Sequence, residues 1–131
     1  MSIEVKFRDG VKVDAYIDSM VIQTDQSVKG GGEGTAPEPF TLFLASLATC
    51  AGYYIKAFCN SRNLPTDTIS LSMDSMYDPI KKRIGKFIIK IYVSMDFPEK
   101  YDQALIHASN VCAVKRHLSE QIELETLVVR V

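Results

Sequence analysis

One uncharged run constrains this chain more than any other feature. No Asp, Glu, Lys or Arg occurs between Glu38 and Lys56, and the residues between them read PFTLFLASLATCAGYYI. This length is at the lower end of the roughly 17–25 residues that a helix needs to cross a bilayer. The run also carries proline, glycine, serine and threonine, and no basic cluster flanks it. We therefore expect a helix over about 40–60 that is buried on nearly all sides, rather than a membrane span.

A helix that is apolar on nearly all sides needs cover on nearly all sides. A single small sheet covers only one face, so a partner subunit is the simplest source of the remaining cover. This favours a homodimer. The alternative is that the N-terminal strands fold back and cover the helix within one chain.

The rest of the chain alternates between strand and helix patterns, without repeats and without a sign of a second domain. Residues 2–25 favour short strands with a hairpin turn at Asp9-Gly10, and residues 28–39 form a Gly/Pro-rich loop. The further expected elements are strands at 69–77 and 86–97, a helix after Pro98, a short helix near 115–118 and a closing strand, IELETLVVRV. We expect a single α+β domain over residues 1–131.

Charge and cysteine content limit the partners and the compartment. The net charge is −1, which gives no broad attraction to nucleic acid or to an anionic membrane. The three cysteines are an odd number and form no CxxC, unlike a secreted disulfide framework. The N-terminus, MSIEVKFRDG, is charged and is not a signal peptide. We expect a cytoplasmic protein with no nucleic-acid and no membrane partner, whose thiols stay reduced unless redox chemistry uses them.

The three cysteines differ in their positions. Cys50 and Cys59 are nine residues apart, so one helix points them to opposite sides and they cannot pair within it. Cys112 closes the apolar stripe of the helix that follows Pro98. Buried thiols often only fill space. The residues alone leave open whether these cysteines are structural or whether Cys50 and Cys112 form a redox pair.

Metal and nucleotide chemistry find little support. The cysteines, His107 and His117 lack the close spacing of a zinc site. The segment GGGEGT has neither the GK[ST] ending of a phosphate loop nor a GxGxxG pattern, and no GxSxG occurs. We expect no metal and no cofactor. Either histidine is a solvated helix residue or a neighbour that stabilises a thiolate.

Two stretches, taken in order, resemble one known family. GGGEGTAPEPFTLFLASLATCAGYYIKAF resembles the signature of the OsmC/Ohr family (osmotically inducible protein C-like, organic hydroperoxide resistance-like), in which a glycine-rich loop leads into a helix carrying the first reactive cysteine. SNVCAVKRHLSEQIELE resembles the segment of that family that carries the second cysteine. The resemblance spans nearly the whole chain.

The resemblance implies both a fold and an activity. The fold is an OsmC-like intertwined α+β homodimer, with two long central helices packed against curved, mostly antiparallel sheets. The activity is a stress-response peroxidase that reduces hydroperoxides, organic ones especially, and is itself reduced by an external dithiol. Cys50 would be the peroxidatic thiolate, which is oxidised to a sulfenic acid, and Cys112 the resolving thiol, which closes a disulfide with it.

A thiol in an apolar pocket needs a nearby cation to keep its thiolate character. Peroxidases of the family use an arginine from the N-terminal strands and a glutamate at the start of the central helix. Arg8 resembles that arginine, whereas Phe40 stands at the glutamate position and Glu38 lies just before it. Arg116 is an alternative cation. The departure at Phe40 resembles a divergent branch of the family.

Two other functions stay open on the same dimer scaffold. The missing glutamate favours a protein that binds apolar small molecules without catalysis. A redox sensor that acts on other proteins would form the disulfide without fast peroxide turnover. Cys59 has no assigned role in any of these, and we expect it to be a bystander.

Overall fold

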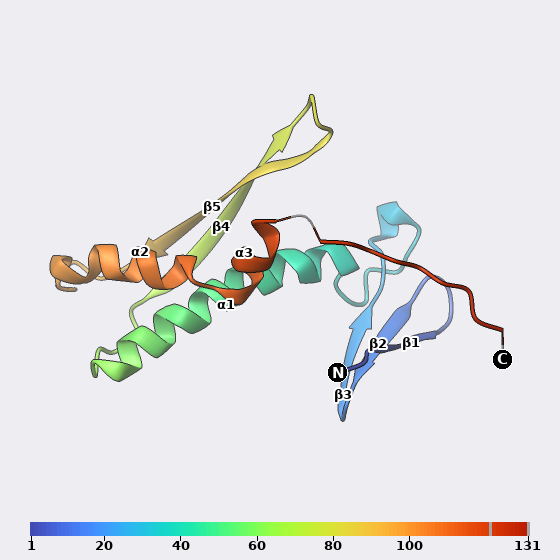
Figure 1. Cartoon of the computed structure of the whole chain (residues 1–131), viewed down its shortest axis with the longest axis horizontal. Helices are drawn as coiled ribbons and strands as arrows, with labels where there is room; N and C mark the ends of the chain where they lie inside the picture. Colours follow the sequence, from blue (N-terminus) through green and yellow to red (C-terminus); the bar gives the residue numbers. More distant parts are fainter. Residues whose placement is uncertain (121, 131) are drawn as a thin grey trace. The chain divides into compact units, whose positions relative to one another are not determined.

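The computed structural model describes residues 1–120 and 122–130, which divide into a unit over residues 1–45 and a unit that begins at Ser46. The elements of the N-terminal unit are β1 (Glu4–Phe7), β2 (Val13–Ile17), β3 (Met20–Thr24) and the short 3₁₀ helix η1 (Val28–Gly30) (Figure 1). Helix α1 (Pro39–Ser61) starts in this unit and continues into the next. The expectation of a single domain stays a prediction.

The N-terminal unit is an antiparallel meander in the order β1-β2-β3. The predicted turn at Asp9-Gly10 is confirmed, and Gly10 takes the left-handed conformation, with φ of +62°, that this turn needs. The N–H of Arg8 donates to the carbonyl of Lys12 at 3.0 Å and closes the hairpin. Alternation of apolar and polar residues therefore located the first strands correctly.

The Gly-rich loop is organised around one carboxylate, that of Asp25. This side chain is 1% exposed. It accepts hydrogen bonds from the backbone N–H of Thr35 at 3.1 Å, the hydroxyl of Thr35 at 2.7 Å and the N–H of Glu33 at 3.3 Å. The loop passes so closely that a Cβ on Gly32 would lie 2.1 Å from the carbonyl oxygen of Gln26. Glycine is needed there for space rather than for its backbone angle.

Helix α1 confirms the helix predicted over about 40–60. Proline at its first position suits a helix start, because that residue needs no N–H partner. The helix ends where Leu64 donates its N–H to the carbonyl of Cys59 and Asn63 adopts a φ of +54°. By length and composition alone α1 could cross a membrane, a test that the core helix of a soluble protein also passes.

The single chain buries only one stripe of α1. The buried side chains recur every four residues, and they are Leu47, Ala51, Ile55 and Cys59. Other apolar residues stay open to solvent, among them Phe40 at 55% exposure and Tyr53 at 66%. The expected burial on nearly all sides is therefore absent within one chain, as far as the structure describes it.

The C-terminal unit pairs a long antiparallel hairpin with α1. Its strands are β4 (Ser70–Asp78) and β5 (Arg83–Tyr92), with a bulge at Met76 and Tyr77. The strand predicted over 86–97 is shifted in the structure. It begins earlier because the carboxylate of Asp78 accepts the N–H groups of Ile80 and Lys81 and tightens the turn. It ends earlier because the N–H of Phe97 turns back to the carbonyl of Ser94 at 3.0 Å.

The predicted helix after Pro98 is interrupted. The elements here are η2 (Glu99–Tyr101), α2 (Asp102–Asn110) and α3 (Ala113–Leu118). Helix α2 stops before Cys112, whose extended backbone, with φ of −61° and ψ of 138°, makes it the N-cap of α3. The prediction that Cys112 closes the stripe of the earlier helix is therefore wrong, and the short helix near 115–118 is confirmed.

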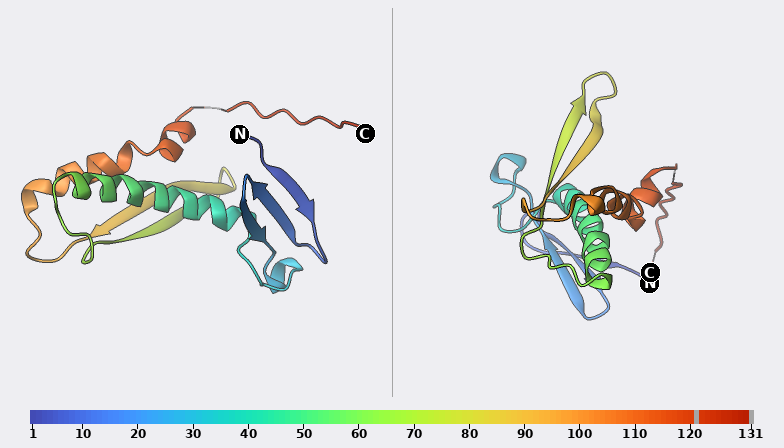
Figure 2. Two further views of the ribbon diagram at one scale, coloured as in Figure 1. Left: turned by 90° about the horizontal axis from the view of Figure 1, so that it is seen from below. Right: turned by 90° about the vertical axis from the view of Figure 1, so that its left-hand side faces the viewer.

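The core of this unit lies where α1 and α2 meet the hairpin. Ile55 and Cys59 of α1 contact Leu105 of α2, and both views of Figure 2 show α2 lying beside α1. Apolar residues of both strands complete the cluster, including Leu71 and Ile91. The α+β class predicted from the sequence is confirmed.

The predicted closing strand is not formed by residues 122–130. A strand needs a neighbour for its N–H and C=O groups, and this segment pairs with no strand of the described chain. Its apolar side chains are mostly exposed, and they are Ile122, Leu124, Leu127, Val128 and Val129. An apolar segment of this kind is left without cover in the single chain.

Candidate functional site

Two of the three cysteines meet at the start of α3. Cys50 lies half-buried on α1, and Cys112 is fully buried beside it. The Cys112 side chain and the backbone N–H groups of Val114 and Ala113 lie close enough to the sulfur of Cys50 to lower the pKa of its thiol. Both thiols are free. The structure thus brings together the two cysteines that the sequence analysis singled out.

These contacts lower the pKa of the Cys50 thiol. The backbone N–H of Val114 is the largest cause, and burial of the sulfur opposes it. The thiol of Cys112 and the N–H of Ala113 add to the lowering, and so does the positive charge of Lys115. Donors that point at a sulfur stabilise its anion, so Cys50 carries more thiolate at neutral pH than an ordinary cysteine does.

Helix α3 positions both sulfurs at once. Its N-cap is Cys112, whose Sγ accepts the backbone N–H of Lys115 at 3.3 Å. The N–H of Arg116 donates to the carbonyl of Cys112 at 3.1 Å and begins the helical ladder. The first two amides of the helix, those of Ala113 and Val114, are left for Cys50. The sequence pattern missed this arrangement because cysteine is not among the residues that usually cap helices.

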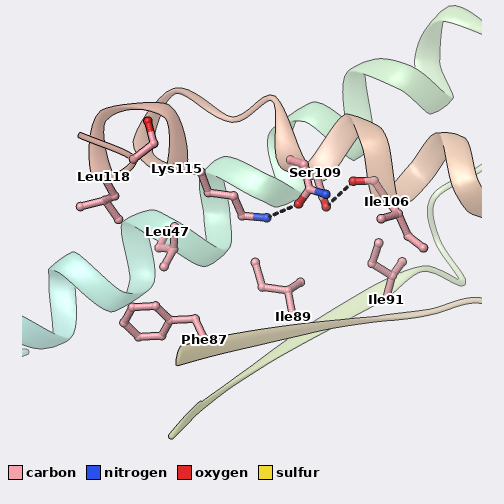
Figure 3. Close-up of a pocket in the computed structure, with 10 residues that line it drawn as sticks. Leu47, Phe87, Ile89, Ile91, Ile106, Ser109, Lys115 and Leu118 are labelled. Carbon is pink, nitrogen blue, oxygen red and sulfur yellow. Dashed lines mark hydrogen bonds between the residues drawn. The ribbon is translucent and has the colours of Figure 1, made fainter. Parts of the chain in front are cut away.

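A cavity of about 450 Å³ lies between α1, α2, α3 and β5 of the C-terminal unit (Figure 3). On α1 it is lined by Leu47, which lies one turn before Cys50 on the same side of the helix. Its floor is apolar and comes from alternate residues of β5, namely Phe87, Ile89 and Ile91. Volume and lining are those of a site for a small organic molecule.

The charged group at this cavity is Lys115, which the sequence analysis did not single out. Its Nζ donates to Oδ1 of Asn110 at 3.0 Å, and both residues line the cavity (Figure 3). Arg116, the cation that the sequence analysis named on this segment, is exposed. Recognition of Cys112 as a helix cap would have indicated Lys115, because the third residue after a cap lies over it.

The other residues named for the thiolate lie in the N-terminal unit. Nε of Arg8 forms an ion pair with Oδ2 of Asp14 at 2.7 Å. Glu38 accepts the backbone N–H of Ser27 at 3.2 Å. The ring of Phe40 stacks with that of Phe43, with centroids 5.6 Å apart. A role for Arg8 or Glu38 at Cys50 stays a prediction.

Cys59 has a different environment from the other two cysteines. It is fully buried in the core of the C-terminal unit, and this burial raises the pKa of its thiol. Among the described residues no group of three His, Cys, Asp or Glu side chains could hold a metal ion. His117 uses Nδ1 to contact the carbonyl of Ala113 at 2.7 Å, and His107 is exposed on α2.

Comparison with protein families gives one match. The sequence model of the family described as OsmC-like protein matches residues 31–127, a range that contains Cys50, Cys112 and the cavity. Comparison with curated proteins finds no match.

Solved structures of low sequence identity share the fold. A candidate osmotic stress induced and detoxification response protein from Psychrobacter arcticus is 18% identical with a TM-score of 0.74, covering 89% of this chain and 87% of its own. An OsmC-like protein from Mycoplasma pneumoniae is 13% identical with a TM-score of 0.71, covering 90% and 86%. The organic hydroperoxide resistance protein OhrB of Bacillus subtilis is 17% identical with a TM-score of 0.54, covering 88% and 87%.

Proposed function

Because the chain belongs to the OsmC-like family, we propose that it is a peroxide-stress enzyme that reduces organic hydroperoxides with Cys50 and Cys112. One observation carries the proposal. The sulfur of Cys50 lies against the thiol of Cys112 and the first N–H groups of α3, and its pKa is lowered there. The hydroperoxide resistance function of the B. subtilis protein with the same fold adds support.

The first step consumes the peroxide at Cys50. Its thiolate attacks one oxygen of the O–O bond, so an S–O bond forms as the O–O bond breaks. The other oxygen leaves as an alkoxide, which takes a proton from water and becomes an alcohol. Cys50 is oxidised to a sulfenic acid and the peroxide is reduced. The lowered pKa favours this step, because the thiolate is the reacting form.

The second step uses the neighbouring thiol. The sulfur of Cys112 attacks the Cys50 sulfenic acid, an S–S bond forms and the hydroxyl group leaves as water. Because the two side chains already lie side by side, the disulfide can form without a large movement of the chain. An external dithiol then reduces the disulfide by thiol–disulfide exchange and returns both thiols. A cytoplasmic location would supply such reductants.

The cavity supports an organic rather than an inorganic substrate. Its floor on β5 and its walls at Leu47, Ile106 and Leu118 are apolar. Burial of an alkyl or aromatic group there is worth about 25 cal/mol per Å² of apolar surface. Hydrogen peroxide has no such group, so the site favours hydroperoxides with a carbon substituent.

We propose that the active form is a homodimer. Large apolar side chains are exposed in one chain, both on α1 and in the segment 122–130. This exposure supports a dimer. A second copy of the chain would cover them.

The test is disulfide mapping after peroxide treatment. Reduced protein is treated with a slight excess of cumene hydroperoxide, with hydrogen peroxide in parallel, and analysed by mass spectrometry without reduction. We expect stoichiometric linkage of Cys50 to Cys112, faster with the organic peroxide. Turnover with a dithiol should be lost in Cys50→Ser and retained in Cys59→Ser, the matched control on the same helix.

Two results would count against this function. If both thiols stay free, the peroxidase proposal fails and a binding protein on the same scaffold becomes the better explanation. If the disulfide forms but a dithiol supports no turnover, a redox sensor explains the site better than an enzyme does.

A further inference from the structure

We propose that Lys115 supplies positive charge to the Cys50 centre, with its ammonium group held by Asn110 at the cavity that Leu47, one turn from Cys50, also lines. The inference deepens the proposed function and rests on Cys50 being the reacting thiol. It assigns an electrostatic role to α3, which lies in the same unit as both sulfurs.

The backbone of Lys115 is fixed by the cap of α3. Its N–H donates to Sγ of Cys112 at 3.3 Å, so the residue cannot move without breaking the cap. The amides of this same helical turn point at Cys50. The position of Lys115 relative to both sulfurs is therefore set by the start of the helix.

The side chain of Lys115 is fixed as well. Its Nζ donates to Oδ1 of Asn110 at 3.0 Å, and Figure 3 shows this bond at the cavity, with Leu47 on the facing helix. Leu47 is one turn from Cys50 on α1. A long side chain that would otherwise sample many rotamers is thus held on the side of α3 that faces the cavity.

The charge of Lys115 meets no carboxylate at this cavity. Of the residues that line it, Lys115 is the charged one, and the remaining polar residues are Ser109, Asn110 and Ser119. Within the described part of the C-terminal unit, the titratable groups that act on Cys50 are Cys112 and Lys115. Arg116 follows directly in the sequence but is exposed, where water screens its charge. Lys115 therefore acts on Cys50 with little local neutralisation.

The ammonium group stabilises negative charge both before and during the attack of Cys50 on the peroxide. Before attack it stabilises the thiolate of Cys50, in the direction of its effect on the pKa of that thiol. During attack the negative charge moves from sulfur to the departing alkoxide oxygen. An ammonium group has three N–H donors, and Asn110 occupies one, so two are available toward the cavity. Fixed charge aimed at a developing anion lowers the barrier.

The experiment measures the thiolate directly, on the full-length reduced protein. The rate of iodoacetamide labelling at Cys50 is followed against pH, with the Cys50 peptide read by mass spectrometry so that the other thiols do not interfere. The variants are Lys115→Met, Lys115→Arg and Arg116→Met, the last being a matched loss of charge at the adjacent position. Circular dichroism checks that each variant is folded.

We expect Lys115→Met to raise the midpoint of the labelling profile by about half a unit to one unit. Lys115→Arg should restore most of the shift, because the charge returns, and Arg116→Met should leave the midpoint unchanged. In 0.5 M salt the difference between wild type and Lys115→Met should shrink. An unchanged midpoint in Lys115→Met, or an equal shift in Arg116→Met, would overturn the assignment.

Failure of this inference is distinguishable from failure of the proposed function. If the protein turns over peroxide but the midpoint of Cys50 labelling does not change in Lys115→Met, the inference is overturned and the proposed enzyme function stands. If the midpoint changes in Lys115→Met but the protein turns over no peroxide, the inference about the thiolate is supported and the proposed peroxidase function fails. If Lys115→Met fails to fold, Lys115→Gln takes its place, because it also removes the charge but keeps a polar end on the side chain. A midpoint in Lys115→Gln equal to that of wild type would then overturn the assignment.

Discussion

The sulfur of Cys112 accepts the backbone N–H of Lys115 at 3.3 Å and so caps α3. The same side chain lies beside Cys50 and helps to lower the pKa of its thiol. Cys112 therefore has a structural role, as a helix cap, in addition to its proposed role as the resolving thiol. Substitution can separate the two, because serine caps helices well but forms no disulfide.

We predict that Cys112→Ser is folded and stable but cannot form the intramolecular disulfide. The serine hydroxyl can accept the N–H of Lys115, so the free energy of unfolding should stay within about 1 kcal/mol of wild type. Cys112→Ala loses the cap acceptor and should cost about 0.5–2 kcal/mol more than the serine variant. Urea unfolding of the two variants measures the difference. Equal stability of both would show that the sulfur contributes nothing as a cap.

The sequence predicted the parts of the fold that follow from local pattern. The hairpin at Asp9-Gly10 and the helix α1 were both located from alternation, turn residues and the uncharged run. The bounds of β5 were not, because they depend on the turn held by Asp78 and on the turn between Ser94 and Phe97. Such side-chain-to-backbone bonds leave little trace in hydrophobic periodicity.

The two cysteines of the site could be predicted from the sequence, but the groups that lower the pKa of the Cys50 thiol could not. Resemblance to a family pointed to Cys50 and Cys112, whereas the nearby amides and Lys115 depend on where α3 begins. The apolar stripe continued through Cys112, so periodicity placed it in the earlier helix instead of at a new cap. The sequence analysis named Arg116 on this segment, whereas the position of Lys115 over the cap depends on where α3 begins.

We predict that thiol labelling separates Cys50 from Cys59. The N–H of Val114 and its neighbours lower the pKa of the Cys50 thiol, whereas burial raises that of Cys59. With a limiting amount of iodoacetamide at about pH 7, Cys50 should be modified first and Cys59 only after unfolding in urea. Peptide mass spectrometry gives the order. Early modification of Cys59 in the folded protein would contradict the buried position that the structure gives it.

We predict that Asp25 makes the N-terminal unit sensitive to acid. Hydrogen bonds from the N–H and hydroxyl of Thr35 lower the pKa of its carboxyl from 3.8 to about 2. A group whose pKa is lower in the folded state contributes stability above its unfolded pKa and loses it as pH falls through the folded one. The thermal midpoint of wild type should therefore fall between about pH 4 and pH 2.

The variant that checks this is Asp25→Asn, which cannot ionise. It should melt at a lower temperature than wild type at about pH 7 and show a smaller further loss between about pH 4 and pH 2. Asp67→Asn is the matched control, because Asp67 is exposed. A wild-type profile over this range that is as flat as that of Asp25→Asn would show that the loop does not depend on the charged carboxylate.

We predict that the apolar segment after α3 holds two chains together. In one chain Leu127 is 72% exposed and Val128 is 83% exposed. Sedimentation at micromolar concentration should give twice the chain mass of 14.6 kDa. Replacing Leu127 and Val128 by serine should weaken the dimer at least tenfold, since each buried side chain contributes about 1.5–3 kcal/mol. Glu123→Gln with Glu125→Gln changes the same segment without removing apolar area and should leave the mass unchanged. A wild-type monomer, or a serine variant that sediments like wild type, would mean that another surface or no partner covers this segment.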